Sequence, residues 1–410
     1  MLTPLRRRDF RTLWAGMAVS LIGDGVFLVA VAWQAYSISH SPSTLAYVGL
    51  ATSLPQVIFV LLGGAVSDRL PRRSVLVAAD LARAAVLAGL AAMVAARTAR
   101  LYELCITGAV IGTATAFSSP AFEALVPQLV PHAELGEANA IDQFVRPGAL
   151  QLAGPALGGL AVAAFGPASC FALDACSFVF SALCALRLAP IPLAATTKQS
   201  LAHDMLDGLR YVRRHAWLWA TFASASLTYL LFLGPTQVLL PYLVRYSLRQ
   251  GASTYGWVLA IGGAGALCGA LLAGHWRAPR NAMLWAYLSW AVATLAVAGY
   301  GLATNVTGLA CAAVVVNGAE AAGAVVWATL KQRRVENVML GRVSSVDWCI
   351  STAFLPLSYA VTAPVAHFLG ARNTLVGAGV LGALATLAFL LVPGVCAPDA
   401  EVSGALVRAR

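Results

Sequence analysis

The sequence predicts an all-α membrane protein with twelve transmembrane helices in two halves of six. Of its 410 residues, 60% are hydrophobic and 11% are charged, and the mean hydropathy is +0.77. Several apolar runs reach the roughly 20 residues that a helix needs to cross a bilayer. Most connections between these runs are short, so consecutive helices should be antiparallel neighbours.

Twelve apolar stretches are long enough to span a membrane, and an even number places both chain ends on the same side. In chain order, the predicted spans are 11–36, 43–66, 74–96, 102–125, 137–164, 168–188, 216–243, 253–275, 281–302, 305–330, 343–369 and 373–394.

One connection is long. In 189–215, apolar residues recur at helical spacing opposite charged ones, which predicts an amphipathic surface helix. The apolar members are Leu201, Met205, Leu209 and Val212, and the charged members are Asp204, Asp207 and Arg210. We therefore expect a six-helix bundle at 1–188, a cytoplasmic linker at 189–215, and a second six-helix bundle with a short tail at 216–410.

A sequence match supports a duplicated unit. Leu135, Gly136 and Asp142 open the fifth span with the same spacing as Leu340, Gly341 and Asp347 at the eleventh. Each match lies at the corresponding place in its own half, as an internal repeat would require.

Basic residues fix the expected orientation. By the predicted topology, 20 of the 27 Lys and Arg residues lie on the side of the two chain ends and five on the other side. This is the positive-inside pattern of a plasma or inner membrane protein with cytoplasmic termini, and it accounts for the net charge of +10 without nucleic acid.

The loop between the second and third spans is the most informative stretch. It reads Gly63-Gly64-Ala65-Val66-Ser67-Asp68-Arg69-Leu70-Pro71-Arg72-Arg73. The register Gly64, Asp68, Arg69, Arg72, Arg73 resembles the signature loop G-x-x-x-D-R-x-x-R-R of the major facilitator superfamily. The resemblance implies a conformational latch, in which Asp68 meets a helix N-terminus or an arginine. The alternative is a loop that only sets topology.

The fifth span carries a second motif, Gly154-Pro155-Ala156-Leu157-Gly158-Gly159. Pro155 removes a backbone donor, and the glycines allow a helix to bend and to pack closely. In the superfamily this G-P-x-x-G-G pattern is typical of antiporters, whereas the alternative is generic close packing. The glycines at 262, 265 and 269 make the eighth span its expected packing partner.

Further phrases resemble the macrolide-efflux and enterobactin-exporter branch of the superfamily. They are Gly23-Asp24-Gly25, Asp80-Leu81-Ala82-Arg83-Ala84, Leu125 to Pro131 and Leu173 to Phe178. Many drug–proton antiporters carry an arginine inside the fourth span, but here that span has only Glu103 and Glu123 near its ends.

Ionisable residues inside spans need a reason, because a charge at the bilayer centre costs roughly 3 kcal/mol on insertion scales. Asp24 and Glu320 fall near mid-depth of the first and tenth spans, which in this superfamily line the central cavity. They are the candidate proton-coupling residues, with structural hydrogen bonding as the alternative. Asp142 and Arg146, spaced i,i+4, form a candidate gate ion pair. Asp80 with Arg83 is interpreted in the same way, as a structural ion pair or gate element, and Asp174 is expected to serve helix packing.

Aromatic and polar residues near the presumed cavity faces predict a surface for an amphiphilic, neutral or cationic organic molecule. The candidate cavity residues are Phe27, Trp33, Gln34, Tyr229, Phe232, Asn317 and Trp327.

Enzyme chemistry is not expected. The two lysines, Lys198 and Lys331, do not follow a glycine, so a Walker A loop is impossible. The eight cysteines form no C-x-x-C pair, and no metal or other cofactor is expected.

The predicted function is a secondary active transporter that exports an amphiphilic organic solute, such as an antibiotic, natural product or siderophore, by proton antiport. Its expected partners are this solute, protons and the lipid bilayer, and we expect a monomer. The alternatives are solute uptake by proton symport in the same fold, and a lipid-flipping or scaffolding role.

Overall fold

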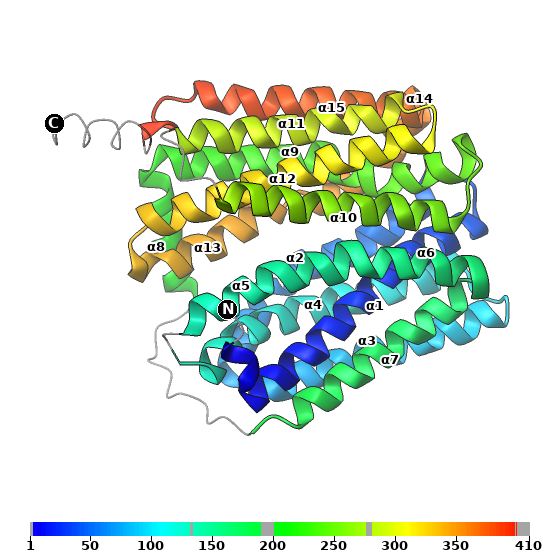
Figure 1. The fold of residues 1–410 in the computed structure, drawn as a ribbon, viewed down its shortest axis with the longest axis horizontal. Coiled ribbons are helices and arrows are strands. Elements are labelled where there is room, and N and C mark those ends of the chain that lie inside the picture. Colours follow the sequence, from blue (N-terminus) through cyan, green and yellow to red (C-terminus); the bar gives the residue numbers. More distant parts are fainter. Residues whose placement is uncertain (1–2, 132–133, 190–200, 276–280, 398, 400–410) are drawn as a thin grey trace. The chain divides into compact units, whose positions relative to one another are not determined.

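The computed structural model describes residues 3–131, 134–189, 201–275, 281–397 and 399, and within these residues it contains helices and no strand (Figure 1). Twelve segments are long and apolar enough to cross a membrane, so the predicted fold class is confirmed. The elements are η1 (Thr3–Arg6), α1 (Arg8–Ile38), α2 (Pro42–Arg69), α3 (Arg72–Ala95), α4 (Leu101–Leu129), α5 (Leu135–Pro147), η3 (Gly148–Ala153), α6 (Gly154–Phe165), α7 (Pro167–Leu186), α8 (Leu201–Arg214), α9 (Ala216–Tyr242), η4 (Leu243–Ser247), α10 (Ala252–His275), α11 (Ala282–Leu302), α12 (Val306–Arg334), α13 (Asn337–Thr352), α14 (Leu355–Leu369), α15 (Ala371–Ala388) and η5 (Phe389–Leu391).

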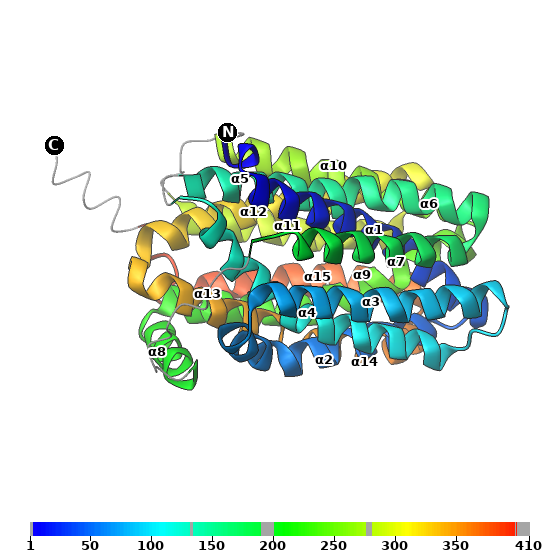
Figure 2. The ribbon, with the colours of Figure 1, turned by 90° about the horizontal axis from the view of Figure 1, so that it is seen from below.

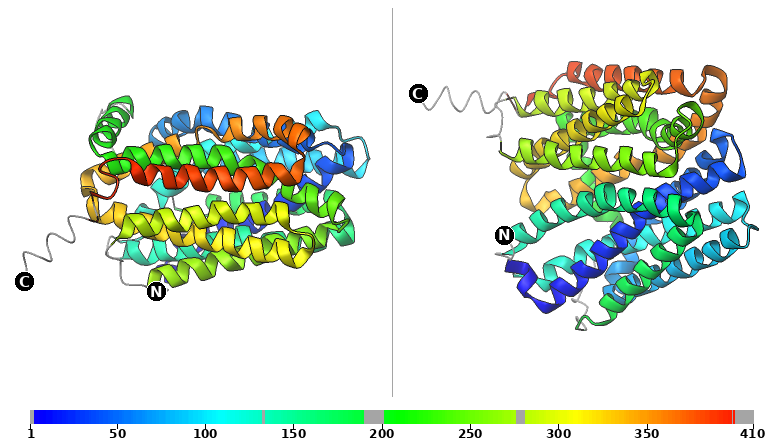
Figure 3. Two further views of the ribbon diagram at one scale, coloured as in Figure 1. Left: turned by 90° about the horizontal axis from the view of Figure 1, so that it is seen from above. Right: turned by 45° about the vertical axis from the view of Figure 1, so that its right-hand side comes forward.

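The chain forms two compact units. The first contains Met1–Thr197 and Val244–Ala260, and the second contains Lys198–Leu243 and Ile261–Arg410. In the first unit α7 packs along both α1 and α3, and α4 packs along α2 and α3 (Figure 2). In the second unit α15 packs between α9 and α11, and α11 packs on α12 (Figure 3).

The fifth and eleventh spans are interrupted at corresponding places. A π-helical segment, η3, begins at Gly148, directly after Pro147, whereas α13 ends at Thr352 and a turn at Ala353 and Phe354 precedes Pro356 of α14. Gly148 and Ala353 both lie 13 residues after the matched leucines, Leu135 and Leu340. Proline lacks the N–H that continues a helix, which explains why the regular hydrogen bonding fails near these positions.

The helix α8 forms the second part of the predicted linker. Residues 190–200 of the linker lie outside the described part of the structure. α8 packs on α13, where a Cβ atom at Gly208 would come 3.0 Å from the Arg342 carbonyl oxygen. Asp207 of α8 forms ion pairs with Arg210 at 3.1 Å and with Arg342 at 3.6 Å. The helix is therefore fixed to the second unit by a close backbone contact and by charge.

Glycines set the closest helix contacts. A Cβ atom at Gly112 of α4 would overlap the Thr52 carbonyl of α2, and one at Gly63 would overlap the Ala116 carbonyl. In the second unit a Cβ atom at Gly269 of α10 would overlap the Gly318 carbonyl of α12. Small residues let backbones touch where no hydrophobic effect drives helices together.

We predict that Gly112→Ala lowers the thermal midpoint of the purified protein, because the added methyl group must push α2 and α4 apart. Overpacking of this kind costs about 1–3 kcal/mol. Gly89→Ala in α3 is the matched control. A Cβ atom there meets open space, and alanine is the better helix former by about 1 kcal/mol. Equal midpoints for Gly112→Ala and the unchanged protein would contradict the packing argument.

Candidate functional site

The first candidate acid, Asp24, lies in α1 between two glycines that face different helices. A Cβ atom at Gly23 would overlap the Asp174 carboxyl and the Ser177 hydroxyl of α7. At Gly25 it would come 2.7 Å from the Leu150 carbonyl oxygen and 2.8 Å from Gly154 Cα. Each helical residue turns by about 100°, so the two glycines face opposite sides and Asp24 points between them. Its side chain is half-buried.

The Gly-Pro motif in α6 packs against α1 directly beside this acid. Cβ atoms at Gly154 and Gly158 would come 2.6 Å from Gly25 Cα and 2.8 Å from Val26 Cα. Gly159 faces another helix, since a Cβ atom there would come 3.0 Å from Gly256 Cα of α10.

The expected role of the glycines further along α10 was wrong. Gly262, Gly265 and Gly269 pack on α12, where Cβ atoms at the first two would come 2.8 Å from Asn317 Nδ2 and from Val314 Cα. Their spacing indicated a close face, but periodicity does not say which helix that face meets. The part of α10 that meets the Gly-Pro motif is its beginning, at Gly256.

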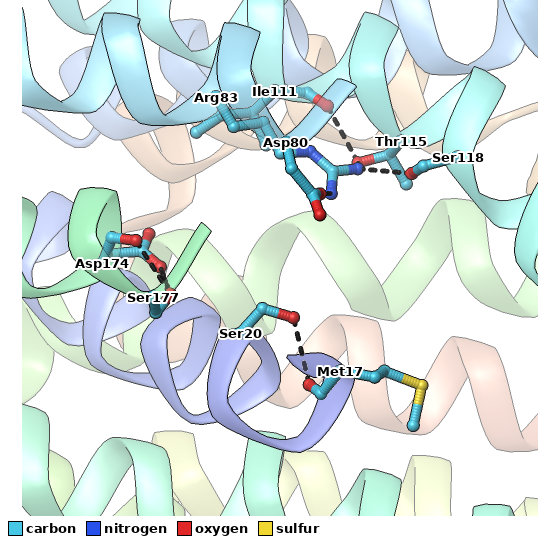
Figure 4. Close-up of polar contacts among 9 residues, drawn as sticks. All are labelled: Met17, Ser20, Asp80, Arg83, Ile111, Thr115, Ser118, Asp174 and Ser177. Carbon is cyan, nitrogen blue, oxygen red and sulfur yellow. Dashed lines mark hydrogen bonds and ion pairs between the residues drawn. The ribbon is translucent and has the colours of Figure 1, made fainter. Parts of the chain in front are cut away.

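Arg83 of α3 is the centre of a buried polar group (Figure 4). Its guanidinium donates to Thr115 Oγ1 at 2.9 Å and Ser118 Oγ at 2.8 Å, both on α4. It also forms an ion pair with Asp80 at 3.5 Å and lies 5.0 Å from the centre of the Phe178 ring of α7. Asp80 and Arg83 thus link α3 to α4 and α7.

Asp142 and Arg146 do form an ion pair, at 3.1 Å along α5. Arg146 also approaches Met17 Sδ of α1 at 3.9 Å. The pair therefore lies where α5 meets α1.

Two arginines of the loop motif, at the start of α3, donate to backbone carbonyls that lie far away in the sequence. Arg72 Nη1 donates to the Ala124 carbonyl near the end of α4 at 2.8 Å. Arg73 donates to the carbonyls of Leu188, at 2.9 Å, and Leu186, at the end of α7. Carbonyls at helix C-termini lack intrahelical partners and carry partial negative charge, so cations are favoured there.

The remaining residues of the loop motif differ in what the structure shows. Gly63, rather than Gly64, makes the close approach to α4, because a Cβ atom at Gly64 meets open space. Arg69 is exposed. The side chain of Asp68 lies outside the described part of the structure.

The second candidate acid, Glu320 of α12, is half-buried. Tyr229 of α9 lies within electrostatic range of it, and the Tyr229 and Phe232 rings are 5.9 Å apart. One turn before Glu320, Asn317 packs against Gly262 and donates to the Ala313 carbonyl at 2.9 Å. Tyr229 is therefore the predicted cavity residue that lies near Glu320, and Asn317 faces α10.

Trp327 lies in the apolar core of the second unit and is 8% exposed. Its Nε1 donates to Asp347 Oδ2 at 3.3 Å, and Lys331 Nζ lies 2.8 Å from the same oxygen. Ser351 donates to the other oxygen at 3.1 Å. Sequence reasoning missed this group, although Asp347 occupies the repeat position of Asp142 and Lys331 is one of two lysines in the chain.

The three candidate cavity residues of α1 have different surroundings. Phe27 lies 5.9 Å from Phe171 of α7, and Gln34 is half-buried. Arg245 donates to the Trp33 carbonyl at 2.8 Å and stacks over its ring at 4.9 Å. Trp33 is therefore partly covered by an arginine, a cation–π contact.

A cavity of about 660 Å³ lies among α2, α3 and α4, and neither Asp24 nor Glu320 is among its lining residues. Its walls are almost wholly apolar, with Val66, Ala78, Ile106, Val110 and Phe117 among the lining residues. It contains none of the predicted solute-binding side chains. Among the described residues, no group of three or more His, Cys, Asp or Glu side chains could hold a metal ion.

Comparison with known proteins places this architecture in a family. The family model described as "Transmembrane secretion effector" matches residues 1–404. An uncharacterized MFS-type transporter of Sinorhizobium fredii, y4rN, is 31% identical over 287 residues, which is 67% of each chain.

Two longer matches are to named efflux proteins. Macrolide efflux protein A of Streptococcus pyogenes is 24% identical and covers 91% of this chain and 93% of its own. Multidrug efflux pump Tap of Mycolicibacterium fortuitum is 26% identical and covers 90% and 91%.

A solved structure of a bacterial homologue of the iron transporter ferroportin has the same fold. Its TM-score is 0.70 at 16% identity, and the match covers 93% of this chain and 98% of that one. The chain therefore belongs to the transmembrane secretion effector family of major facilitator superfamily transporters.

Proposed function

We propose that this transporter exports an amphiphilic organic solute in exchange for protons, with Asp24 as the principal proton-coupling residue and Glu320 as the second. The observation that carries the proposal is the position of Asp24. It is an ionisable side chain inside a transmembrane helix, flanked by contacts with α7 and with the Gly-Pro motif of α6. The efflux proteins among its relatives support the direction of transport.

The solute class follows from the side chains beside the acids. Tyr229, Phe232 and Asn317 accompany Glu320, and Phe27 lies three residues after Asp24. Aromatic rings and carboxyls favour amphiphilic molecules that are neutral or cationic. Trp327 is left out of the proposed binding surface, because it is buried in the core.

Proton exchange supplies enough energy for export. Each proton that moves inward yields about 1.4 kcal/mol per pH unit, and about 2.3 kcal/mol per 100 mV when net charge moves with it. An antiporter also requires that proton and solute binding exclude each other, which an acid within the solute path provides.

The first test uses proteoliposomes with an acidic lumen and ethidium, a fluorescent amphiphilic cation, as the probe. An antiporter accumulates the probe because protons leave the lumen, whereas a symporter needs an acidic exterior, whatever the orientation of the protein. We expect Asp24→Asn to abolish accumulation and Glu320→Gln to reduce it. Glu336→Gln, at an exposed surface acid, is the matched control. If both intramembrane variants accumulate the probe as the unchanged protein does, the coupling site lies elsewhere, with Asp142 and Arg146 next.

The second test concerns the loop after α2. We propose that Asp68 acts as a latch that binds a helix N-terminus or an arginine in one conformation and releases it in the other. Contacts of this kind are worth up to about 2 kcal/mol when partly buried, which is enough to shift a balanced two-state equilibrium. Asp68→Asn should slow transport several-fold without loss of folded protein. Full transport at equal expression would leave the loop with a role in topology alone.

The third test concerns orientation. We propose that both termini and the linker lie on the cytoplasmic side of an inner or plasma membrane. The linker joins six-helix bundles at 1–188 and 216–410. In a background without the eight native cysteines, Gln199→Cys should resist an impermeant thiol reagent in intact cells, and Thr98→Cys should react. Reaction of Gln199→Cys without lysis would overturn the topology.

A further inference from the structure

The most enclosed carboxyl of the first unit is Asp174 of α7, which is 0% exposed. Its Oδ1 accepts a hydrogen bond from Ser177 Oγ at 3.1 Å (Figure 4). Its Oδ2 is also buried and has no hydrogen-bond partner among the described residues. A buried polar atom of this kind is costly unless the group is neutral or paired.

Helix α1 packs directly against this carboxyl. Gly23 leaves room for the Asp174 carboxyl and Ser177 of α7. Earlier in α1, Gly16 lies against Ser181 and Cys184 of α7. Asp24 directly follows Gly23, and its carboxyl and that of Asp174 lie within electrostatic range of each other. The two acids therefore lie on the two helices that meet at Gly23.

Acidic side chains outnumber basic ones around Asp24 and Asp174. Among the described residues, Arg83 of α3 is the base within electrostatic range of Asp174, and its ion pair at 3.5 Å is with Asp80. Arg146 of α5 reaches the field of Asp24 but pairs with Asp142. The residues of α4 at Arg83 are the uncharged Thr115 and Ser118, and α6 carries no charged side chain. Three carboxyls, from Asp24, Asp80 and Asp174, therefore face one available guanidinium.

We propose that Asp174 is a proton-binding residue of the transport cycle, coupled to Asp24, so that this chain exchanges two protons for each solute. The proposal rests on the proposed antiport function. Asp24 is half-buried and Asp174 is fully enclosed, so the proton on Asp174 exchanges with water by way of Asp24. Its O–H bond breaks, the Asp24 carboxylate takes the proton, and Arg83 stays charged throughout.

The first readout needs no solute. Infrared difference spectra of the purified full chain, recorded between neutral and alkaline pH, reveal protonated carboxyl groups by their C=O stretching band. We expect Asp174→Asn to remove one such carboxyl per molecule, whereas Glu336→Gln should remove none. Ser177→Ala should shift the frequency of the same band, because it removes the hydrogen bond to Asp174. An unchanged band in both Asp174→Asn and Ser177→Ala would overturn the proposal.

The second readout is the limiting accumulation of ethidium in proteoliposomes at zero membrane potential. One pH unit supports about a tenfold ratio for each exchanged proton. The unchanged protein should therefore approach about a hundredfold ratio, and Asp174→Asn about tenfold. Equal limiting ratios would show that Asp174 contributes no exchangeable proton and would overturn the proposal. This ratio is a thermodynamic quantity, so slower transport by a variant does not imitate the result.

A matched substitution separates proton binding from packing. Asp80→Asn removes the carboxylate that pairs with the buried Arg83, so we expect a lower thermal midpoint than for Asp174→Asn, which replaces a neutral acid by an amide of the same shape. A higher thermal midpoint for Asp80→Asn than for Asp174→Asn would mean that Asp174 is the charged partner of Arg83, and it would overturn the proposal. Ethidium accumulation by neither the unchanged protein nor any variant, under either direction of the pH gradient, would show that the chain does not exchange this probe for protons. The infrared spectra would then still decide whether Asp174 holds a proton.

Discussion

The first unit depends on the close approach of α1 to α7 on one side and to α6 on the other. Gly23 and Gly25 make both contacts possible, and any side chain at either position would collide with backbone or with a buried carboxyl. Close packing also excludes water, which leaves the acids beside these glycines in a medium where an unpaired charge is expensive. The same contacts that hold the helices together therefore determine which carboxyls can be charged.

The two halves carry an aspartate at a matching position, and its ion-pair partner differs between them. Asp142 and Asp347 occupy matching positions of the fifth and eleventh spans. Asp142 pairs with Arg146 on its own helix, whereas Asp347 takes Lys331 from α12, the Trp327 indole and Ser351. The second arrangement ties two helices together, so a movement of α13 relative to α12 would have to separate a partly buried ion pair. The first pair crosses no helix boundary and allows α5 more freedom.

Much of the fold could be predicted from the sequence, because apolar length alone identifies membrane spans. The partners of individual residues could not, since they depend on tertiary contacts. Arg72 and Arg73 were identified in a loop motif, but the carbonyls that they cap lie 52 and 115 residues away. Trp327 was grouped with cavity aromatics because of its span, and only the packing of Trp217, Phe222 and Trp290 around it reveals a core position. Asp174 was expected to serve packing, and its unpaired oxygen was not visible in the sequence.

The surroundings of Asp24 and Glu320 give the two acids different capacities. Asp24 belongs to a group with two further carboxyls and one guanidinium, so gaining or losing a proton there changes the field on Asp80, Arg83 and Asp174 together. Glu320 lies near Tyr229, and among the described residues no charged side chain contributes to its surroundings. If both acids bind protons as proposed, a proton on Glu320 would act on the proposed binding surface. A proton on Asp24 would act on the group of charges that joins α1, α3 and α7, which suits a residue proposed to couple proton binding to a change of conformation.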